Sequence, residues 1–339
     1  MTAVNRKEKG IYIACIAIIS ILAGRLMLLL ATPLAEFFSH PETVSLLVYL
    51  ETGRVVKPAM VTIPTEPMET TVPKTPTQPQ EKGLSFDEED AQLVQVSNFS
   101  QYAIDVPALL MQELQWNLEG QVPRVLILHS HATESYTKTP QDSYVSSAAY
   151  RTLDTQYNMV RVGAALKEAL EAKGISVIHD TNLYDYPSYN DSYIQSREAL
   201  QAWLKEYPEI CLVIDLHRDA ADTSSGSQLK TLATVSGENS AQLMMVVGSN
   251  AGGRHHPQWK QNLALAAKLH AQLEKRFPGI CRPISFRTER FNQDLSAGAL
   301  LIEVGAAGDM LEEALVAAAA LAEGIADLSA GVVTADSTS

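Results

Sequence analysis

The sequence predicts an α/β domain in which a mainly parallel sheet is flanked by helices on both faces. From residue 124 onward, short apolar runs alternate with amphipathic stretches of helical period. The apolar runs lack the in-and-out alternation of a sheet with one solvent face, which is typical of strands buried on both sides. Because strands and helices alternate along the chain, we expect parallel pairing through helical crossovers.

Each element follows from a local pattern. A short run of aliphatic and β-branched residues indicates a strand, whereas an amphipathic stretch that stops at Gly174 or Pro208 indicates a helix. The expected strands cover 125–128, 175–178, 210–216, 232–236, 243–247 and 299–304, and the expected helices cover 106–114, 158–172, 192–207, 258–277 and 310–328.

The N-terminal region has the pattern of a membrane segment. Residues 11–34 are strongly apolar and, as a helix, long enough to span a hydrocarbon core of about 30 Å. Basic residues precede them, which predicts a cytoplasmic tail at 1–10 and an extracytoplasmic location for the rest. A cleaved signal peptide is the alternative, but Pro33 breaks the pattern of its cleavage site. We therefore expect an uncleaved single-pass anchor.

A spacer is expected between this anchor and the domain. Residues 35–57 form a juxtamembrane segment, and residues 58–83 are rich in Pro and Thr without an apolar period, which predicts a disordered linker. Residues 84–120 are transitional, the domain covers 121–330, and 331–339 form a disordered tail. Such a spacer would let a tethered domain reach a layer above the membrane.

Composition excludes two classes of site. The formal net charge of -13 argues against nucleic acid as a partner, because phosphate binding needs a concentrated basic surface. The three cysteines form no CxxC pair, so we expect free thiols and no thiolate zinc site. Any metal site must therefore use histidines and carboxylates.

Polar residues follow the first expected strand of the domain where it ends. His129, His131 and Glu134 leave this strand for a loop. Sites in open α/β sheets gather at the carboxyl ends of strands, and two imidazoles and a carboxylate this close in sequence can bind one metal ion. A polar loop with capping residues is the alternative.

Two further strands carry polar residues at the same edge. His217 follows the run 210–216, and Asp215 is placed to orient a ligating imidazole. Glu303 lies inside an apolar strand, where a carboxylate is costly unless it is paired, protonated or near a metal. Its alternative role is a structural ion pair with Arg287 or Arg290.

Together these residues predict a hydrolytic zinc site. Two histidines and one carboxylate would hold Zn²⁺ and leave a position for water, and Glu303 would carry a proton from that water to the leaving amine. The chain has no GxSxG motif, and its cysteines have no adjacent base in the sequence, so serine or cysteine nucleophilic chemistry is not expected.

Four segments resemble the stage II sporulation protein P family, and they occur in its order within residues 124–328: HSHATESY at 129–136, IDLHRD at 214–219, FNQDLS at 291–296 and ALLIEVG at 299–305. The resemblance implies a zinc amidase-like, phosphorylase/hydrolase-like fold. It also implies cleavage of the bond between N-acetylmuramic acid and L-alanine in peptidoglycan, with endopeptidase action on cross-links. The partners it implies are stage II sporulation proteins D and M, in septal wall remodelling during engulfment.

The resemblance also assigns site residues by position. His131 and His217 match its two ligand histidines, and Glu303 matches its catalytic glutamate. The wider amidase group carries its carboxylate ligand where the helix after the first strand begins, and this chain has no glutamate there. We therefore expect Glu134 as the third ligand, with His129 as the alternative because residues i and i+2 of an extended chain share a face.

Other residues carry weaker expectations. Arg218, Asn292 and Gln293 could hold carboxylate or amide groups of the stem peptide, with hydrogen bonding within loops as the alternative. His255 and His256 are expected to be exposed loop residues. Two other functions stay open, namely a zinc peptidase acting mainly on cross-links and a non-catalytic wall-binding or scaffold module. In each case we expect the chain in the septal membrane of sporulating cells, with its domain outside.

Overall fold

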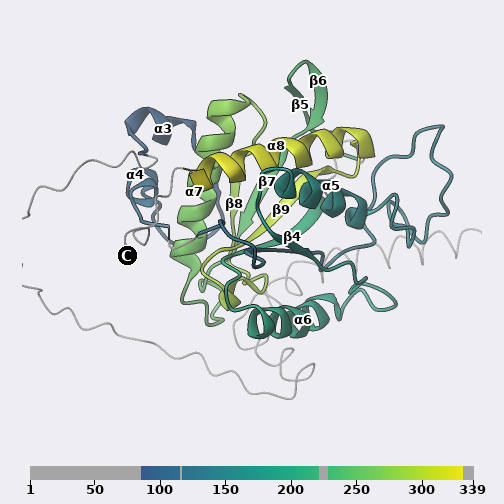
Figure 1. The fold of residues 1–339 in the computed structure, drawn as a ribbon, viewed down its shortest axis with the longest axis horizontal. Coiled ribbons are helices and arrows are strands. Elements are labelled where there is room, and N and C mark those ends of the chain that lie inside the picture. The colour runs from purple at the N-terminus through teal and green to yellow at the C-terminus, as the bar shows by residue number, and fades with distance from the viewer. Residues whose placement is uncertain (1–84, 115–116, 221–227, 331–339) are drawn as a thin grey trace, which may run out of the picture. The chain divides into compact units, whose positions relative to one another are not determined.

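The computed structural model describes residues 85–114, 117–220 and 228–330 (Figure 1). The chain divides into two units, Met1–Thr77 and Gln78–Ser339, and every described residue belongs to the second. The expected anchor, juxtamembrane segment, linker and C-terminal tail all lie outside the described residues. Among the residues that are described, no helix is both long and apolar enough to cross a membrane.

A central sheet of seven strands organises the described part of the chain, in the order β1-β8-β7-β9-β4-β2-β3. Its strands are β1 Val96–Asn98, β2 Val125–Leu128, β3 Val177–His179, β4 Leu212–Asp219, β7 Leu243–Val247, β8 Ile284–Phe286 and β9 Ala299–Ala306. All neighbours pair in parallel except β7 and β9, which are antiparallel. The expected mainly parallel α/β sheet is therefore confirmed, with one reversal.

The reversal follows from the connection between β4 and β7. Its described residues hold the antiparallel hairpin of β5 Leu232–Val235 and β6 Glu238–Ala241, and no helix. A helical crossover would return the chain to the opposite edge of the sheet, as parallel pairing requires. The chain instead re-enters from the edge at which it left, so β7 runs against β9.

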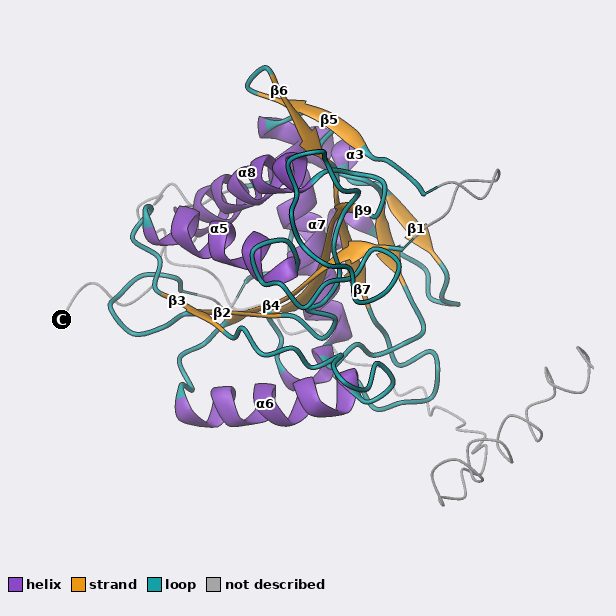
Figure 2. Cartoon of the chain, turned by 90° about the vertical axis from the view of Figure 1, so that its right-hand side faces the viewer, coloured by secondary structure: helices purple, strands orange, loops and turns teal. Residues whose placement is uncertain are grey.

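Helices cover both faces of the sheet (Figure 2). α5 Met159–Glu171, α7 Trp259–Arg276 and α8 Leu311–Ala330 join the sheet in the larger apolar core. α6 Ser192–Glu206 lies on the other side, where a second cluster includes Leu128, Leu200 and Val213. Because these strands contribute side chains to both faces, β2 and β7 are apolar along their length, and β4 and β9 are apolar up to the polar residues near their carboxyl ends.

Local signals explain where α5 begins and ends. The side chain of Asn158 caps the helix by accepting a hydrogen bond from the backbone N–H of Val160. Gly174 follows the helix with φ 81°, in the left-handed region that glycine adopts without strain. The bounds expected from sequence therefore hold to within a residue at each end of this helix.

Several short elements were not expected. The transitional segment contains α3 Glu88–Leu93 and β1, and its expected helix is shorter, as α4 Val106–Leu110. The run at 232–236 pairs only with β6 and stays outside the central sheet. β8 and the 3₁₀ turn η1 Gln293–Leu295 have three residues each, too few to produce a periodic pattern, and β6 has the largely polar sequence Glu-Asn-Ser-Ala. Their position depends on the strands and helices around them.

Candidate metal centre

The site lies where β2, β4 and β9 end side by side. β2 and β9 flank β4, and both pair with it in parallel. The register places His217 of β4 directly beside Glu303 of β9. Asp215 and His217 are two residues apart on one strand, so their side chains share a face. Val213 shares that face too and belongs to the cluster beneath α6, which places the site on the α6 side of the sheet.

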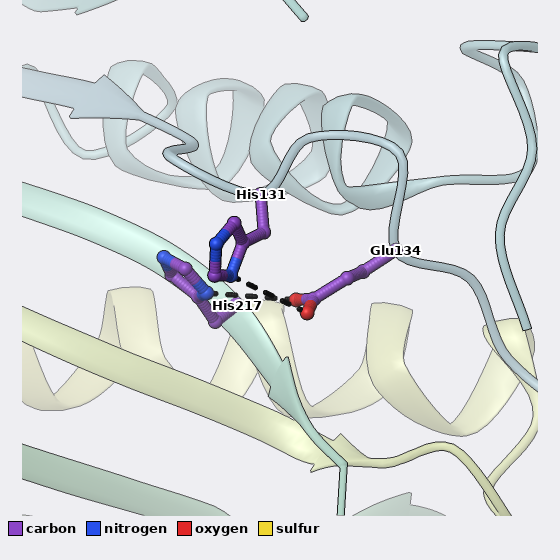
Figure 3. A group of neighbouring side chains, drawn as sticks. All are labelled: His131, Glu134 and His217. Atoms are coloured by element: carbon purple, nitrogen blue, oxygen red, sulfur yellow. Dashed lines mark ion pairs between the residues drawn. The ribbon is translucent and has the colours of Figure 1, made fainter. Parts of the chain in front are cut away.

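Three side chains from two of these strand ends converge (Figure 3). One ligand atom from each of His131, Glu134 and His217 lies within 4.8 Å of the others. Nδ1 of His131 is 3.6 Å from Oε1 of Glu134, and Nδ1 of His217 is 3.5 Å from Oε2 of the same carboxylate. Two imidazole nitrogens and one carboxylate oxygen form the protein donor set of a zinc site with an open position. This set therefore fits a zinc ion.

The carboxylate of Glu134 is also held by two arginines. Nη2 of Arg151 lies 3.2 Å from Oε1, and the backbone N–H of Arg218 donates to Oε2 at 3.3 Å. Burial by itself raises the pKa of this carboxyl group, but the hydrogen bond and charge of His217 and the charge of Arg218 outweigh burial and lower it to about 2. Glu134 is therefore an anion at neutral pH, as a metal ligand must be.

His217 is oriented by a buried carboxylate. Its Nε2 lies 2.9 Å from Oδ1 of Asp215, and Ser130 donates from its backbone N–H and its hydroxyl to the two oxygens of that carboxylate. Burial opposes protonation of His217, but the charge and hydrogen bond of Asp215 and the hydrogen bond to Glu134 outweigh it and hold the pKa of this imidazole well above its ordinary value. Nε2 therefore faces Asp215 and Nδ1 faces Glu134, and a metal ion bound at Nδ1 would take the place of its proton. A carboxylate behind a ligand imidazole fixes its tautomer and raises its basicity. The role expected for Asp215 therefore matches its geometry.

His131 is packed between aromatic rings. It stacks on Tyr189 with 4.5 Å between ring centroids. It also forms T-shaped contacts with His217 and Tyr193, whose ring centroids lie 5.0 and 5.4 Å from its own. Burial, followed by the nearby charge of His217, lowers the pKa of His131 to about 4. The imidazole is therefore neutral at pH 7, which is the form that binds metals.

Glu303 is half-buried and forms no ion pair with any residue that the structure describes. Its Oε2 is shielded from solvent and has no hydrogen-bond partner among the described residues. Burial raises its pKa to about 8, against the opposing charge of His217. The alternative ion pairs are not formed, because Arg287 pairs with Glu289 and Arg290 with Asp294. A carboxyl group with a shielded, unpartnered oxygen beside a ligand set is suited to proton transfer.

The alternative ligand His129 lies outside the metal group. β2 ends at Leu128 and the chain turns, so the alternation of an extended strand no longer applies to the two histidines. Nδ1 of His129 lies 3.0 Å from the carbonyl oxygen of Leu216, and Nε2 lies 2.8 Å from Nε2 of His179. Burial lowers the pKa of this imidazole to about 4. Both nitrogens of His129 are therefore engaged away from Glu134.

The residues expected to bind substrate are placed differently from one another. Arg218 is buried, and its guanidinium donates to the carbonyl oxygens of Ser135 and Tyr150. Gln293 is also buried. Its side-chain oxygen accepts a hydrogen bond from the N–H of Gly248, and its side-chain nitrogen donates one to the carbonyl oxygen of Val246. These two side chains support loops, and contact with substrate stays a prediction for both.

Asn292 and His256 differ from the expectations in other ways. The amide nitrogen of Asn292 donates to the carbonyl oxygen of Tyr193 at 2.9 Å, and the residue also lines a cavity. His256 is 1% exposed, so the expectation of an exposed loop residue is wrong for it. A buried position for His256 has no signal in its Gly-rich sequence context.

Sequence reasoning missed four residues around the ligands. Arg151 pairs with Glu134 and with Asp185, and its guanidinium lies 4.6 Å from the ring centroid of Tyr189. Asp185 in turn accepts hydrogen bonds from the backbone and hydroxyl of Thr133, in the ligand loop. Tyr189 and Tyr193 contact His131. The concentration of Tyr and Asp at 184–193, after the carboxyl end of a strand, was an available signal.

Comparison with known proteins identifies the family. The model for Stage II sporulation protein P matches residues 49–326. The Stage II sporulation protein P of Bacillus subtilis (strain 168) is 29% identical over 215 residues, which cover 60% of this chain and 50% of the relative. This chain therefore matches about half the length of that curated relative.

Solved amidases give a weaker likeness. An N-acetylmuramyl-L-alanine amidase of Mycobacterium smegmatis aligns at 14% identity over 63% of this chain and 99% of its own, with a TM-score of 0.36. The CwlD amidase from Clostridioides difficile, in complex with the GerS lipoprotein, aligns at 13% over 60% and 98%, also at 0.36. At such TM-scores these likenesses carry no inference about this chain. The family match covers most of the sequence and all of the ligand residues, and on that ground the chain is a member of the Stage II sporulation protein P family.

Proposed function

We propose that this chain is a zinc-dependent hydrolase that cuts the amide bond between N-acetylmuramic acid and the L-alanine of the peptidoglycan stem peptide. The observation that carries the proposal is the group of His131, Glu134 and His217, with the unpaired carboxyl group of Glu303 beside it. Membership in a sporulation family supports a wall substrate, and the donor set supports zinc.

The residues of the site divide the work of hydrolysis. His131, Glu134 and His217 would hold the ion, which, when bound, polarises the substrate carbonyl and acidifies water. Asp215 keeps the Nε2–H of His217 engaged, so that Nδ1 points into the site. Glu303 accepts the proton of the attacking water and delivers it to the nitrogen of the leaving amine. The aromatic packing of Tyr189 and Tyr193 holds the ring of His131 in place.

We propose further that the domain acts outside the cytoplasmic membrane of sporulating cells, at the septum, with stage II sporulation proteins D and M as partners. The apolar segment at 11–34 and the basic residues before it support this location. A protease added to intact spheroplasts should digest the domain. Protection of the domain until the membrane is lysed would contradict the proposed orientation.

The test of the activity compares full-length variants on purified peptidoglycan. The wild-type chain should contain zinc and release peptides with a new N-terminal L-alanine, identified by mass spectrometry. Glu303→Gln should keep zinc and lose about 10²–10⁴-fold in rate, because general acid–base catalysis contributes on that order. His217→Ala should lose the zinc itself. A wild-type chain that binds zinc and leaves the wall intact would refute the proposal.

The same digestion separates the two alternative functions. A zinc peptidase acting mainly on cross-links would convert cross-linked stems into separate stems that stay attached to the glycan, because the amide bonds to N-acetylmuramic acid remain intact. A non-catalytic wall-binding module would yield no products and would keep its role in engulfment in the Glu303→Gln variant. The unpaired carboxyl group of Glu303 favours catalysis, since a structural role would call for a partner.

A further inference from the structure

A cavity lies beside the metal centre, and its lining includes none of the ligands His131, Glu134 and His217. It has a volume of about 430 Å³, and its lining includes Tyr193, Arg254, Thr288, Arg290 and Phe291. Tyr193 connects it to the site, because the same ring meets the edge of His131. Another cavity, of about 320 Å³, is lined by Cys211 and Gly298, which precede β4 and β9 at the opposite edge of the sheet. Of these two cavities, the first therefore adjoins the chemistry.

The cavity is positively charged although the chain as a whole carries -13. Asp294 is already bound by Arg197 at 2.8 and 2.7 Å and by Arg290 at 3.1 Å. Burial lowers the pKa of Arg290, Asp294 opposes this, and the like charges of Arg197 and Arg254 add to it. In the described part of the chain, Arg254 has no hydrogen bond or ion pair. Glu289 also lines the cavity, and it pairs with Arg287 at 3.5 Å. Two carboxylates thus face four guanidinium groups, and an additional anion would relieve the repulsion among these arginines.

The walls of this cavity are fixed by contacts between backbones. The N–H of Ser249 donates to the carbonyl oxygen of Glu289 at 3.1 Å, and the N–H of Gly252 donates to that of Thr288 at 3.2 Å. A Cβ on Gly252 would lie 2.6 Å from the Thr288 oxygen, so the close approach requires glycine. The two loops therefore form a preorganised wall, which lowers the ordering cost of binding.

We propose that this cavity binds a free carboxylate of the wall peptide whose amide bond lies at the metal centre. This proposal rests on the proposed function and deepens it. Arg254 and Arg290 bind the carboxylate, because a guanidinium matches a carboxylate in charge and planar geometry. The rings of Tyr193 and Phe291, whose centroids are 6.2 Å apart, contact the aliphatic part of the same peptide. The cavity thus selects peptides that carry an acidic group beyond the bond to be cut.

Calorimetry on the full-length Glu303→Gln chain, loaded with zinc, measures this binding without hydrolysis. The probes are two soluble N-acetylmuramoyl peptides of one sequence, with side-chain and α-carboxyl groups either free or converted to carboxamides. The free acid should bind about tenfold more tightly than the amide, because hydrogen bonds between charged groups exceed neutral ones by roughly that factor. Adding Arg254→Gln should remove most of this difference.

Two controls make the result specific. Arg161→Gln removes the same charge from α5, where the side chain of Arg161 has no ion pair within the described residues, and it should leave the preference for the acid unchanged. Zinc content should be unchanged by Arg254→Gln, which separates the cavity from the metal centre. Equal binding of acid and amide, or equal losses in the two arginine variants, overturns the proposal. Failure of the proposed function would show independently, as wild-type protein that cuts no wall.

Discussion

Replacement of Asp215 by asparagine should weaken zinc binding and leave the fold intact. Oδ1 of Asp215 faces two donors, the N–H of Ser130 and Nε2 of His217, and Oδ2 faces the hydroxyl of Ser130. An asparagine can keep its carbonyl oxygen toward the two donors, and its amide group can donate to the hydroxyl oxygen. The substitution removes the negative charge behind His217, and it is this charge that raises the basicity of the imidazole. Groups of this kind contribute about 10–100-fold to metal affinity, or about 1.4–2.8 kcal/mol.

Asp180 provides a matched control for this substitution. It follows the end of β3, is buried like Asp215, and accepts hydrogen bonds from Asn182, Tyr184 and Trp203, none of which belongs to the metal group. Competition with a chromophoric chelator should show a 10–100-fold loss for Asp215→Asn and less than about a threefold change for Asp180→Asn. An unchanged affinity in the Asp215 variant, or equal losses in both, would refute the assigned orientation of His217.

Three further outcomes follow from the same contacts. Gly163→Ala should lower the free energy of unfolding by about 1–3 kcal/mol in urea titrations, because the new Cβ would lie 2.5 Å from Nε2 of His179, which contacts His129. As a control at the exposed Glu168 of α5, the alanine variant should be more stable than the glycine variant by about 1 kcal/mol. In zinc-free protein, the pKa of Glu303 is about 8 in the folded state, above the ordinary value of 4.5. Between these two pH values the folded state binds more protons than the unfolded state does. The stability that the protonated carboxyl group contributes is therefore lost as pH rises through 8. The stability gained by Glu303→Gln should therefore grow from about pH 5 to about pH 9, and a constant difference would contradict the burial argument. Arg218→Lys should lower the free energy of unfolding by about 1–3 kcal/mol, and a raised KM at unchanged stability would return Arg218 to a substrate-binding role.

Long apolar elements could be predicted because their pattern is local. The run at 125–128 is the strand β2 as expected, and α5 has its cap at Asn158 and its stop at Gly174. Short elements could not be predicted, because three residues such as Ile284–Phe286 show no period and become a strand only between β1 and β7. The antiparallel entry of β7 likewise depends on how the β5–β6 hairpin redirects the chain.

The sequence by itself determined that His131, His217 and Glu303 would meet, because the carboxyl ends of parallel strands share one edge of a sheet. Only the tertiary structure decided that Glu134 faces both imidazoles while His129 turns toward His179. It also decided that Arg151 and Tyr193 complete the surroundings of the ligands and that a cationic cavity adjoins them. Strand ends are encoded by hydrophobic patterns within a few residues, whereas the direction of a side chain in a loop is set by distant segments packed against it.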